Sequence, residues 1–172
     1  MPLTREDPTI ETRVLWALGD RLATIREADG FHATFPRESI FELADNPEQQ
    51  LAPSIAMWIA EDVPTEYVGG RKRHKLVIAL RFRVKAQGSA GGGQKGKTKL
   101  AGQILGDLQR VTYHALEVPC PRAPNGDTMI NVTIPTYEDS HLVQPDATSE
   151  FAEGVLGIIL YPERDEENPY LY

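Results

Sequence analysis

The sequence predicts an α+β fold, with a mainly antiparallel sheet and two principal helices packed on one face of it. Two segments, 8–28 and 100–115, repeat apolar side chains every three or four residues, which is typical of helices with one buried face. Segments 74–86 and 127–138 alternate apolar and polar side chains, as strands with one wet face do. Short connections between successive strand-like segments favour antiparallel pairing.

The first helix is expected over residues 8–28. Asp7 followed by Pro8 is a good helix start, and "ADG" before Phe31 is a typical helix end. The stripe that should face the core consists of Ile10, Val14, Leu18, Leu22 and Ile25. Trp16 lies within this helix and Trp58 within a strand, and we interpret both as core anchors.

Several strands should follow the first helix. "FHATF" and "SIFEL" are short strand-like pieces divided by Pro36, and "PSIAMWIAED" from Pro53 is a mostly apolar run that indicates a buried strand. The best alternation is in "HKLVIALRFRVKA", which begins at His74. Its inward residues should be Leu76, Ile78, Leu80, Phe82 and Val84. After the second helix, Ile130, Val132 and Ile134 should face inward, and "GVLGIILYP" supplies a last strand.

A glycine- and lysine-rich stretch precedes the second helix. Residues 86–97 contain no side chain suited to a core, so we expect a long flexible insertion loop there. The helix after it carries a stripe made by Leu100, Ile104, Leu108, Val111 and Ala115. With 172 residues, the chain is expected to form a single domain over 1–172, ending in an acidic tail at 163–172.

Composition argues against several classes of protein. No apolar run approaches the roughly 18 residues that cross a bilayer, and the N-terminus is too acidic and polar for a signal peptide, so we expect no membrane contact and synthesis in a cytoplasm. The single cysteine, Cys120, allows no intramolecular disulfide. The four histidines lack metal-ligand spacing, and no nucleophile motif occurs, so we expect no catalytic residue, no metal and no cofactor.

The net charge of −7 conceals a strong asymmetry. No Asp or Glu occurs between Val68 and Gly106, whereas acidic residues gather in the tail. Such a split favours contact with charged surfaces, including other copies of the same chain. The candidate assembly contacts are Arg71, Lys72, Arg73, Lys75, Lys95, Lys97, Lys99, Glu163, Asp165, Glu166 and Glu167.

"GGGQKGKT", from Gly91 to Thr98, matches the phosphate-binding pattern G-x-x-x-x-G-K-[ST]. In a true phosphate loop, the first glycine directly follows an apolar, central parallel strand. Here six residues separate Val84 from Gly91, and the preceding strand carries charge on one face. This context disfavours a nucleotide hydrolase. We therefore interpret the match to the pattern at Gly91, Gly96, Lys97 and Thr98 as due to chance.

The element order resembles that of tail terminator and minor tail proteins of tailed bacteriophages. The resemblance covers roughly residues 9–117: "IETRVLWALGDRLATIREADGF", "PSIAMWIAEDVP", "HKLVIALRFRVKA" and "GQILGDLQRVTYHAL". It rests on hydrophobic pattern and element order rather than on diagnostic residues. The chain departs from the shortest members in its loop around Gly91, its connection at 118–149 and its acidic tail.

The resemblance implies a non-enzymatic virion protein, assembled in the host bacterial cytoplasm, that caps the tail tube as a homo-oligomeric ring, usually a hexamer. Its partners would be further copies of itself, the tail tube protein and the head connector, with genomic DNA in transient contact inside the channel. Two alternatives stay open. One is a head-completion or connector protein, and the other is a nucleic-acid-binding module that uses "GGRKRHK" and "KGKTK".

Overall fold

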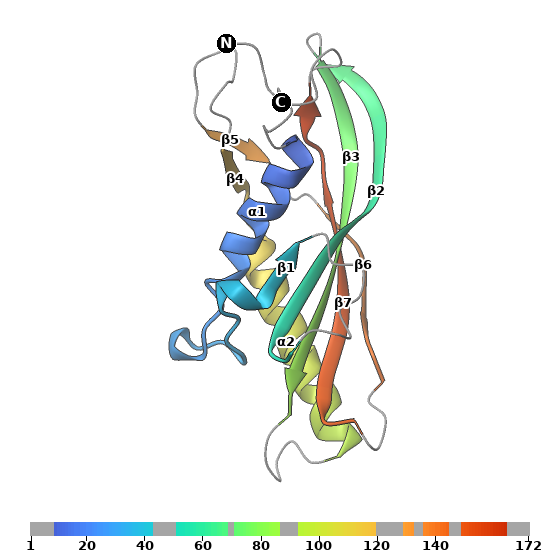
Figure 1. Ribbon diagram of the computed structural model, residues 1–172. Coiled ribbons are helices and arrows are strands. Elements are labelled where there is room, and N and C mark those ends of the chain that lie inside the picture. The colour runs from blue at the N-terminus through green and yellow to red at the C-terminus, as the bar shows by residue number, and fades with distance from the viewer. Residues whose placement is uncertain are drawn as a thin grey trace.

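The computed structural model describes residues 9–42, 51–68, 71–86, 93–119, 129–132, 136–144 and 149–164. Its elements are α1 (Ile10–Leu22), the 3₁₀ turns η1 (Glu27–Asp29) and η2 (Arg37–Ser39), β1 (Ile40–Glu42), β2 (Ser54–Val68), β3 (Arg71–Lys85), α2 (Gln94–Thr112), β4 (Leu116–Pro119), β5 (Met129–Val132), β6 (Thr136–Leu142), β7 (Phe151–Leu160) and β8 (Glu163–Arg164). The predicted α+β class is confirmed (Figure 1).

The main sheet has the strand order β1-β2-β3-β7-β6, and β8 adds to β3 beyond the end of β7. Only β1 runs parallel to its neighbour, so the sheet is mainly antiparallel, as predicted. The central strand is β3, which pairs with β2 on one side and with β7 on the other. A second, two-stranded sheet consists of β4 and β5.

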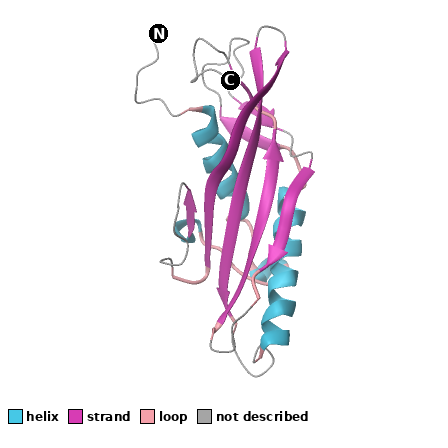
Figure 2. Ribbon diagram, turned by 90° about the vertical axis from the view of Figure 1, so that its right-hand side faces the viewer, coloured by secondary structure: helices cyan, strands magenta, loops and turns pink. Residues whose placement is uncertain are grey.

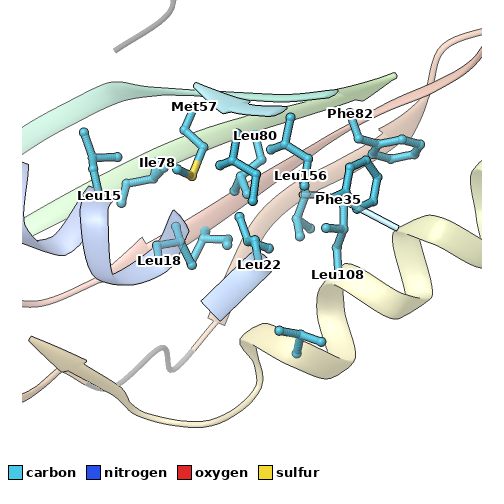
Figure 3. Close-up of a cluster of buried hydrophobic side chains, with 14 of the residues drawn as sticks. Leu15, Leu18, Leu22, Phe35, Met57, Ile78, Leu80, Phe82, Leu108 and Leu156 are labelled. Atoms are coloured by element: carbon cyan, nitrogen blue, oxygen red, sulfur yellow. The ribbon is translucent and has the colours of Figure 1, made fainter. Parts of the chain in front are cut away.

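Both helices cover the same face of the main sheet (Figures 1 and 2). The core lies between the two layers, where leucines of α1 meet Met57, Ile78 and Leu80 of the sheet, and Leu108 of α2 lies near Leu156 (Figure 3). Four of the five inward residues predicted for β3 are buried, and Val84 packs partly buried against the same core. We call this the core face of the sheet and the opposite one the outer face.

The first helix is shorter than the predicted 8–28. It begins after Thr9, whose side chain accepts a hydrogen bond from the backbone N–H of Thr12, whereas Asp7 lies outside the described residues. It ends at Leu22, where the Thr24 hydroxyl donates to the carbonyl of Arg21 and competes with the helical pattern. Ile25 is nonetheless fully buried, because the chain after the helix folds back on the core.

The segment 31–35 is not a strand, contrary to prediction. Phe35 is buried by a local turn, in which its N–H donates to the Ile25 carbonyl at 3.1 Å. The chain turns at Gly30, whose φ of 85° lies in the left-handed region that glycine adopts without strain. The second piece does contain a strand, β1, which pairs with β2.

The second helix begins earlier than predicted. Residues 94–97, expected in the loop, form the first turn of α2, and residues 87–92 lie outside the described residues. Sequence reasoning missed this start because no side chain caps it: the N-cap is Gly93, with a φ of 118°. Ala115, predicted for the apolar stripe, lies beyond the helix and is exposed, since α2 ends at Thr112.

The C-terminal half also differs from prediction. Segment 127–138 is not one strand, because β5 pairs with β4 in the small sheet whereas β6 pairs with β7 in the main sheet. Ile130, Val132 and Ile134 are predicted to face inward, but their side chains are not among those that the structure describes. The last strand is confirmed as β7, and of the predicted tail only Glu163 and Arg164 are described, as β8.

Two glycines give opposite predictions for alanine substitution. A Cβ at Gly154 would lie 2.7 Å from two ring carbons of the buried Phe82, whereas a Cβ at Gly106 on α2 would meet nothing within 4 Å. We expect Gly154→Ala to destabilise the fold by about 1–3 kcal/mol through overpacking. Gly106→Ala should stabilise it by up to ~1 kcal/mol, because glycine is a poor helix former. Urea denaturation measures both, and equal effects would contradict this account of the core face.

Candidate functional site

The structure describes the last part of the phosphate-loop pattern and not its beginning. Gly91 lies outside the described residues, whereas Gly96, Lys97 and Thr98 lie inside the first turns of α2. The Thr98 hydroxyl donates to the Gln94 carbonyl at 2.8 Å, four residues earlier in the same helix. In this position it satisfies the helix backbone instead of facing a bound metal ion.

Lys97 has a structural contact. Its side chain is only 7% exposed, and its Nζ donates a hydrogen bond to the backbone carbonyl of Ser149, just before β7. This bond joins the start of α2 to the chain that enters β7. A phosphate-binding lysine would instead direct its ammonium group toward the ligand.

The strand before the pattern also differs from the strand of a phosphate loop. That loop follows a central parallel strand. Here β3 is antiparallel to both β2 and β7. The described geometry therefore gives a nucleotide site no support.

A recess of about 500 Å³ lies beside the start of α2, lined by Gln94, Lys95, Thr98, Lys99 and Gln144. Lys95 and Lys99 are exposed, as their role as candidate contacts requires. Lys97 belongs to the same turns but points elsewhere, because its ammonium group is held at Ser149. The structure thus separates the three lysines that the sequence groups together.

The basic stretch at the start of β3 is matched by acidic side chains of neighbouring strands. Arg73 contacts Glu66 of β2 at 2.6 Å and Glu163 of β8 at 3.0 Å, and Lys75 contacts Glu61 of β2 at 3.3 Å. The hydrogen bond that Arg73 donates to the Glu163 carboxylate is the main reason why the pKa of Arg73 lies above its ordinary value. Arg73 and Glu163, both candidate assembly contacts, therefore contact each other within one chain.

The other candidates in this region have less defined places. Lys72 lies over the ring of Tyr67, with its Nζ 5.4 Å from the ring centre. Arg71 pairs with Val68 at the end of the hairpin that joins β2 to β3. Asp165, Glu166 and Glu167 lie outside the described residues. Their predicted part in assembly stays a prediction.

Further along β3, the cations of the outer face also have partners on β7 or just before it. Arg81 and Arg83 share one carboxylate, that of Glu153, at 2.8 and 2.9 Å, and Arg83 stacks on the ring of Phe151 at 3.8 Å. Lys85 contacts Glu150 at 3.1 Å. One carboxylate thus contacts two guanidinium groups at this part of the outer face.

Between these charged groups, the residues of β3 and β7 on the outer face are apolar. The β-sheet register places Trp58 of β2, Ala79 of β3 and Gly157 of β7 in one row, and Val77 and Ile159 in the next. Val77 is 2% exposed yet does not belong to the core cluster between the layers. None of the described helices or strands lies over this face (Figures 1 and 2).

The two tryptophans were both predicted as core anchors, and neither belongs to the core cluster. Trp16 is 48% exposed, and Trp58 is half-buried on the outer face. A helical wheel, at 100° per residue, would have placed Trp16 opposite the stripe of Ile10, Val14 and Leu18. That signal was present in the sequence but was outweighed by the usual burial of tryptophan.

Two histidines form pairs with aspartates. Buried His74 lies 2.7 Å from Asp62 through Nδ1, and its backbone N–H donates to the Pro162 carbonyl, so it ties β2, β3 and the chain after β7 together. His32 lies 3.0 Å from Asp107 of α2, and its own backbone N–H donates to the same carboxylate. Among the described residues, no three His, Cys, Asp or Glu side chains are grouped so that they would hold a metal ion.

Comparison with known proteins gives no assignment for this site, so its geometry is the basis for interpreting it. Neither the family models nor the curated proteins contain a match to this chain. In the described part of the chain, neither helix has the length and apolar character needed to cross a bilayer.

The contact between Lys97 and Ser149 predicts a structural role for the motif lysine. Lys97→Ala should lower the free energy of unfolding by about 1–3 kcal/mol, because a buried hydrogen bond from a charged donor is lost. The matched control is Lys95→Ala, an exposed change in the same turn that should stay within about 0.5 kcal/mol. Urea denaturation measures stability, and calorimetric titration with magnesium-ATP measures binding. Nucleotide binding that disappears in Lys97→Ala while stability is unchanged would contradict the structural role.

Proposed function

We propose that this protein is a non-enzymatic assembly protein of a tailed bacteriophage, which closes into a homo-oligomeric ring, caps the tail tube and joins it to the head connector. The virion is then its final location. The proposal combines the element order that resembles tail terminator proteins with the surface of the folded chain.

The observation that carries the proposal is the outer face of the main sheet, over which none of the described helices or strands lies. It holds an apolar centre around Trp58, Ala79 and Gly157, bordered by ion pairs on β3 and its neighbours. An apolar centre with a polar border is the usual composition of a protein–protein interface. A soluble chain gains stability when another protein covers such a face.

A connector protein on the head side of the neck would use the same kind of face, and it remains the nearest alternative. A nucleic-acid-binding module is less well supported by the contacts. Arg73, Lys75 and Lys85 already contact carboxylates of the same chain, so fewer cations are available to phosphates. The net charge of −7 adds general repulsion from nucleic acid.

The ring predicts a defined oligomer that does not depend on nucleotide. Native mass spectrometry across a concentration series should reveal a closed species, six copies by the resemblance, with the same mass with and without magnesium-ATP. Closed rings have a fixed copy number because every interface is satisfied. A monomer that binds one nucleotide, or open-ended polymers of increasing mass, would contradict the proposal.

The same ion pairs predict weak binding to DNA. Fluorescence anisotropy with a labelled random-sequence duplex at about 150 mM salt should give at most the weak affinity of nonspecific contacts, with a Kd of about 10⁻⁴ M or weaker. Glu153→Gln, which releases Arg81 and Arg83 from their shared carboxylate, should tighten it. Tight, steeply salt-dependent binding by the unmodified chain would favour the nucleic-acid module instead.

A further inference from the structure

The strand β8 continues β7 along the same edge of β3. Leu160, the last residue of β7, pairs with Leu76 of β3. Glu163, three residues further along the chain, pairs with Arg73, three residues earlier on β3. The two strands therefore share one register, and within the described residues β8 alone pairs with this end of the β3 edge.

Pro162 separates the two strands without shifting the register. It lies opposite His74, whose backbone N–H donates to the Pro162 carbonyl at 2.9 Å. A hydrogen-bonded antiparallel pair normally exchanges two such bonds, but proline has no N–H and returns none. The segment from Pro162 to Arg164 is thus held by fewer ladder bonds than a regular continuation of β7 would be. Its junction to β7 is Tyr161, which is 39% exposed and belongs to neither strand.

Side chains of this segment alternate between two environments. Pro162 is buried, whereas the carboxylate of Glu163 lies 3.0 Å from the guanidinium of Arg73. Glu66 of β2 contacts the same guanidinium at 2.6 Å, so Arg73 is held between two carboxylates. In strand addition, backbone hydrogen bonds supply affinity and contacts to alternate side chains supply specificity. The end of the β3 edge therefore has the parts of a site for an extended Pro–Glu segment.

A second copy of the chain could offer this edge either its β3 or its β8. Two β3 edges paired antiparallel about Arg73 would place Arg73 opposite Arg73, and like charges directly opposite each other are destabilising. The β8 of a second copy instead carries Glu163, which makes the ion pair that already exists within one copy. Exchange of an identical element between copies is a low-cost route to association.

We infer that the β3 edge from Lys72 to His74 is a strand-addition site for an extended Pro–Glu segment, which Pro162 and Glu163 fill within one copy and the same residues of a second copy fill in an assembly. The contact is heterologous, because a segment of one copy adds to a different surface of the next. The inference stands on the sheet geometry and not on the proposed ring, so either can fail without the other.

A peptide with residues 160–167 (LYPERDEE) tests the site, because it carries the segment that a second copy would offer. The acceptor is the chain truncated after Tyr161, whose site is empty, and the control is the chain truncated after Arg164, whose site is filled. The shift of the His74 amide signal in an NMR titration measures binding. The peptide should bind the acceptor about 10-fold more tightly than the control or better, because the attached segment competes at a high effective concentration.

A charge reversal tests the specificity of the site. The peptide with Glu163→Lys should bind the acceptor about 5-fold more weakly or worse, because it places like charges opposite each other. Urea denaturation verifies that the acceptor is folded. If it is not, the full chain with Glu163→Lys, which weakens β8 without removing it, serves as the acceptor against the unmodified chain. No binding to the acceptor, equal affinity for acceptor and control, or no effect of the charge reversal overturns the inference.

Disulfide trapping in the full chain tests the exchange between copies. One variant carries Lys72→Cys and the other Arg164→Cys, at positions that are register partners, and both carry Cys120→Ser so that no other thiol remains. A disulfide between the two variants requires β8 of one copy to lie on β3 of another. Under mild oxidation, non-reducing electrophoresis should show about 5-fold more heterodimer than a control mixture with Lys95→Cys in place of Lys72→Cys.

The two results of disulfide trapping separate this inference from the proposed function. A closed ring whose heterodimer yield equals that of the control mixture overturns the inference and leaves the proposed function standing. A specific heterodimer from a chain that never forms a closed ring supports the inference and contradicts the proposed function.

Discussion

The alternation of side chains along β3 is the constraint on which the rest of the structure depends. Leu76, Ile78, Leu80 and Phe82 point into the core, whereas Lys75, Arg81 and Arg83 point to the outer face. A shift of one residue in its pairing would put these cations into the core, so the register with β2 and β7 is strongly specified. Once β3 is fixed, the positions of both neighbouring strands and the surface for the helices follow.

The two helices are joined by the hydrogen bonds of one arginine side chain. Arg21, in the last turn of α1, donates to the carbonyls of Val111, His114 and Ala115 around the end of α2, at 3.3, 3.3 and 2.8 Å. Carbonyls at the end of a helix lack donors within the helix, so one guanidinium there both satisfies backbone groups and joins the two helices. The same end of α1 is held to the strand side, because Arg37 contacts Asp20 and Glu42. Burial opposes the charge of Arg37, but these hydrogen bonds outweigh it and raise its pKa above the ordinary value.

Sequence reasoning predicted the fold class, the central strand and the last strand because hydrophobic period is a local property of the chain. It failed where local signals compete or are absent. Thr24 ends α1 through a hydrogen bond, Gly93 begins α2 without a cap, and β4 lies within a stretch whose prolines indicated only an end. The phosphate-loop pattern shows the same limit, since the contact between Lys97 and Ser149 joins residues 52 positions apart and cannot be read from spacing.

The candidate site shows why a basic stretch of sequence differs from a basic surface. The cations of β3 are consecutive in the chain, but antiparallel pairing brings acidic residues from 61–66 and 150–153 beside them. Those acids belong to segments that sequence reasoning treated separately, so their neutralising effect was not foreseen. Once the charges are paired within the chain, they contribute little to attraction between molecules, because exposed ion pairs gain little from further partners in water. In the proposed assembly, the apolar centre that these pairs surround is the part of the face that would drive association. For this reason we place the proposed interface around Trp58, Ala79 and Gly157 and not on the lysines and arginines.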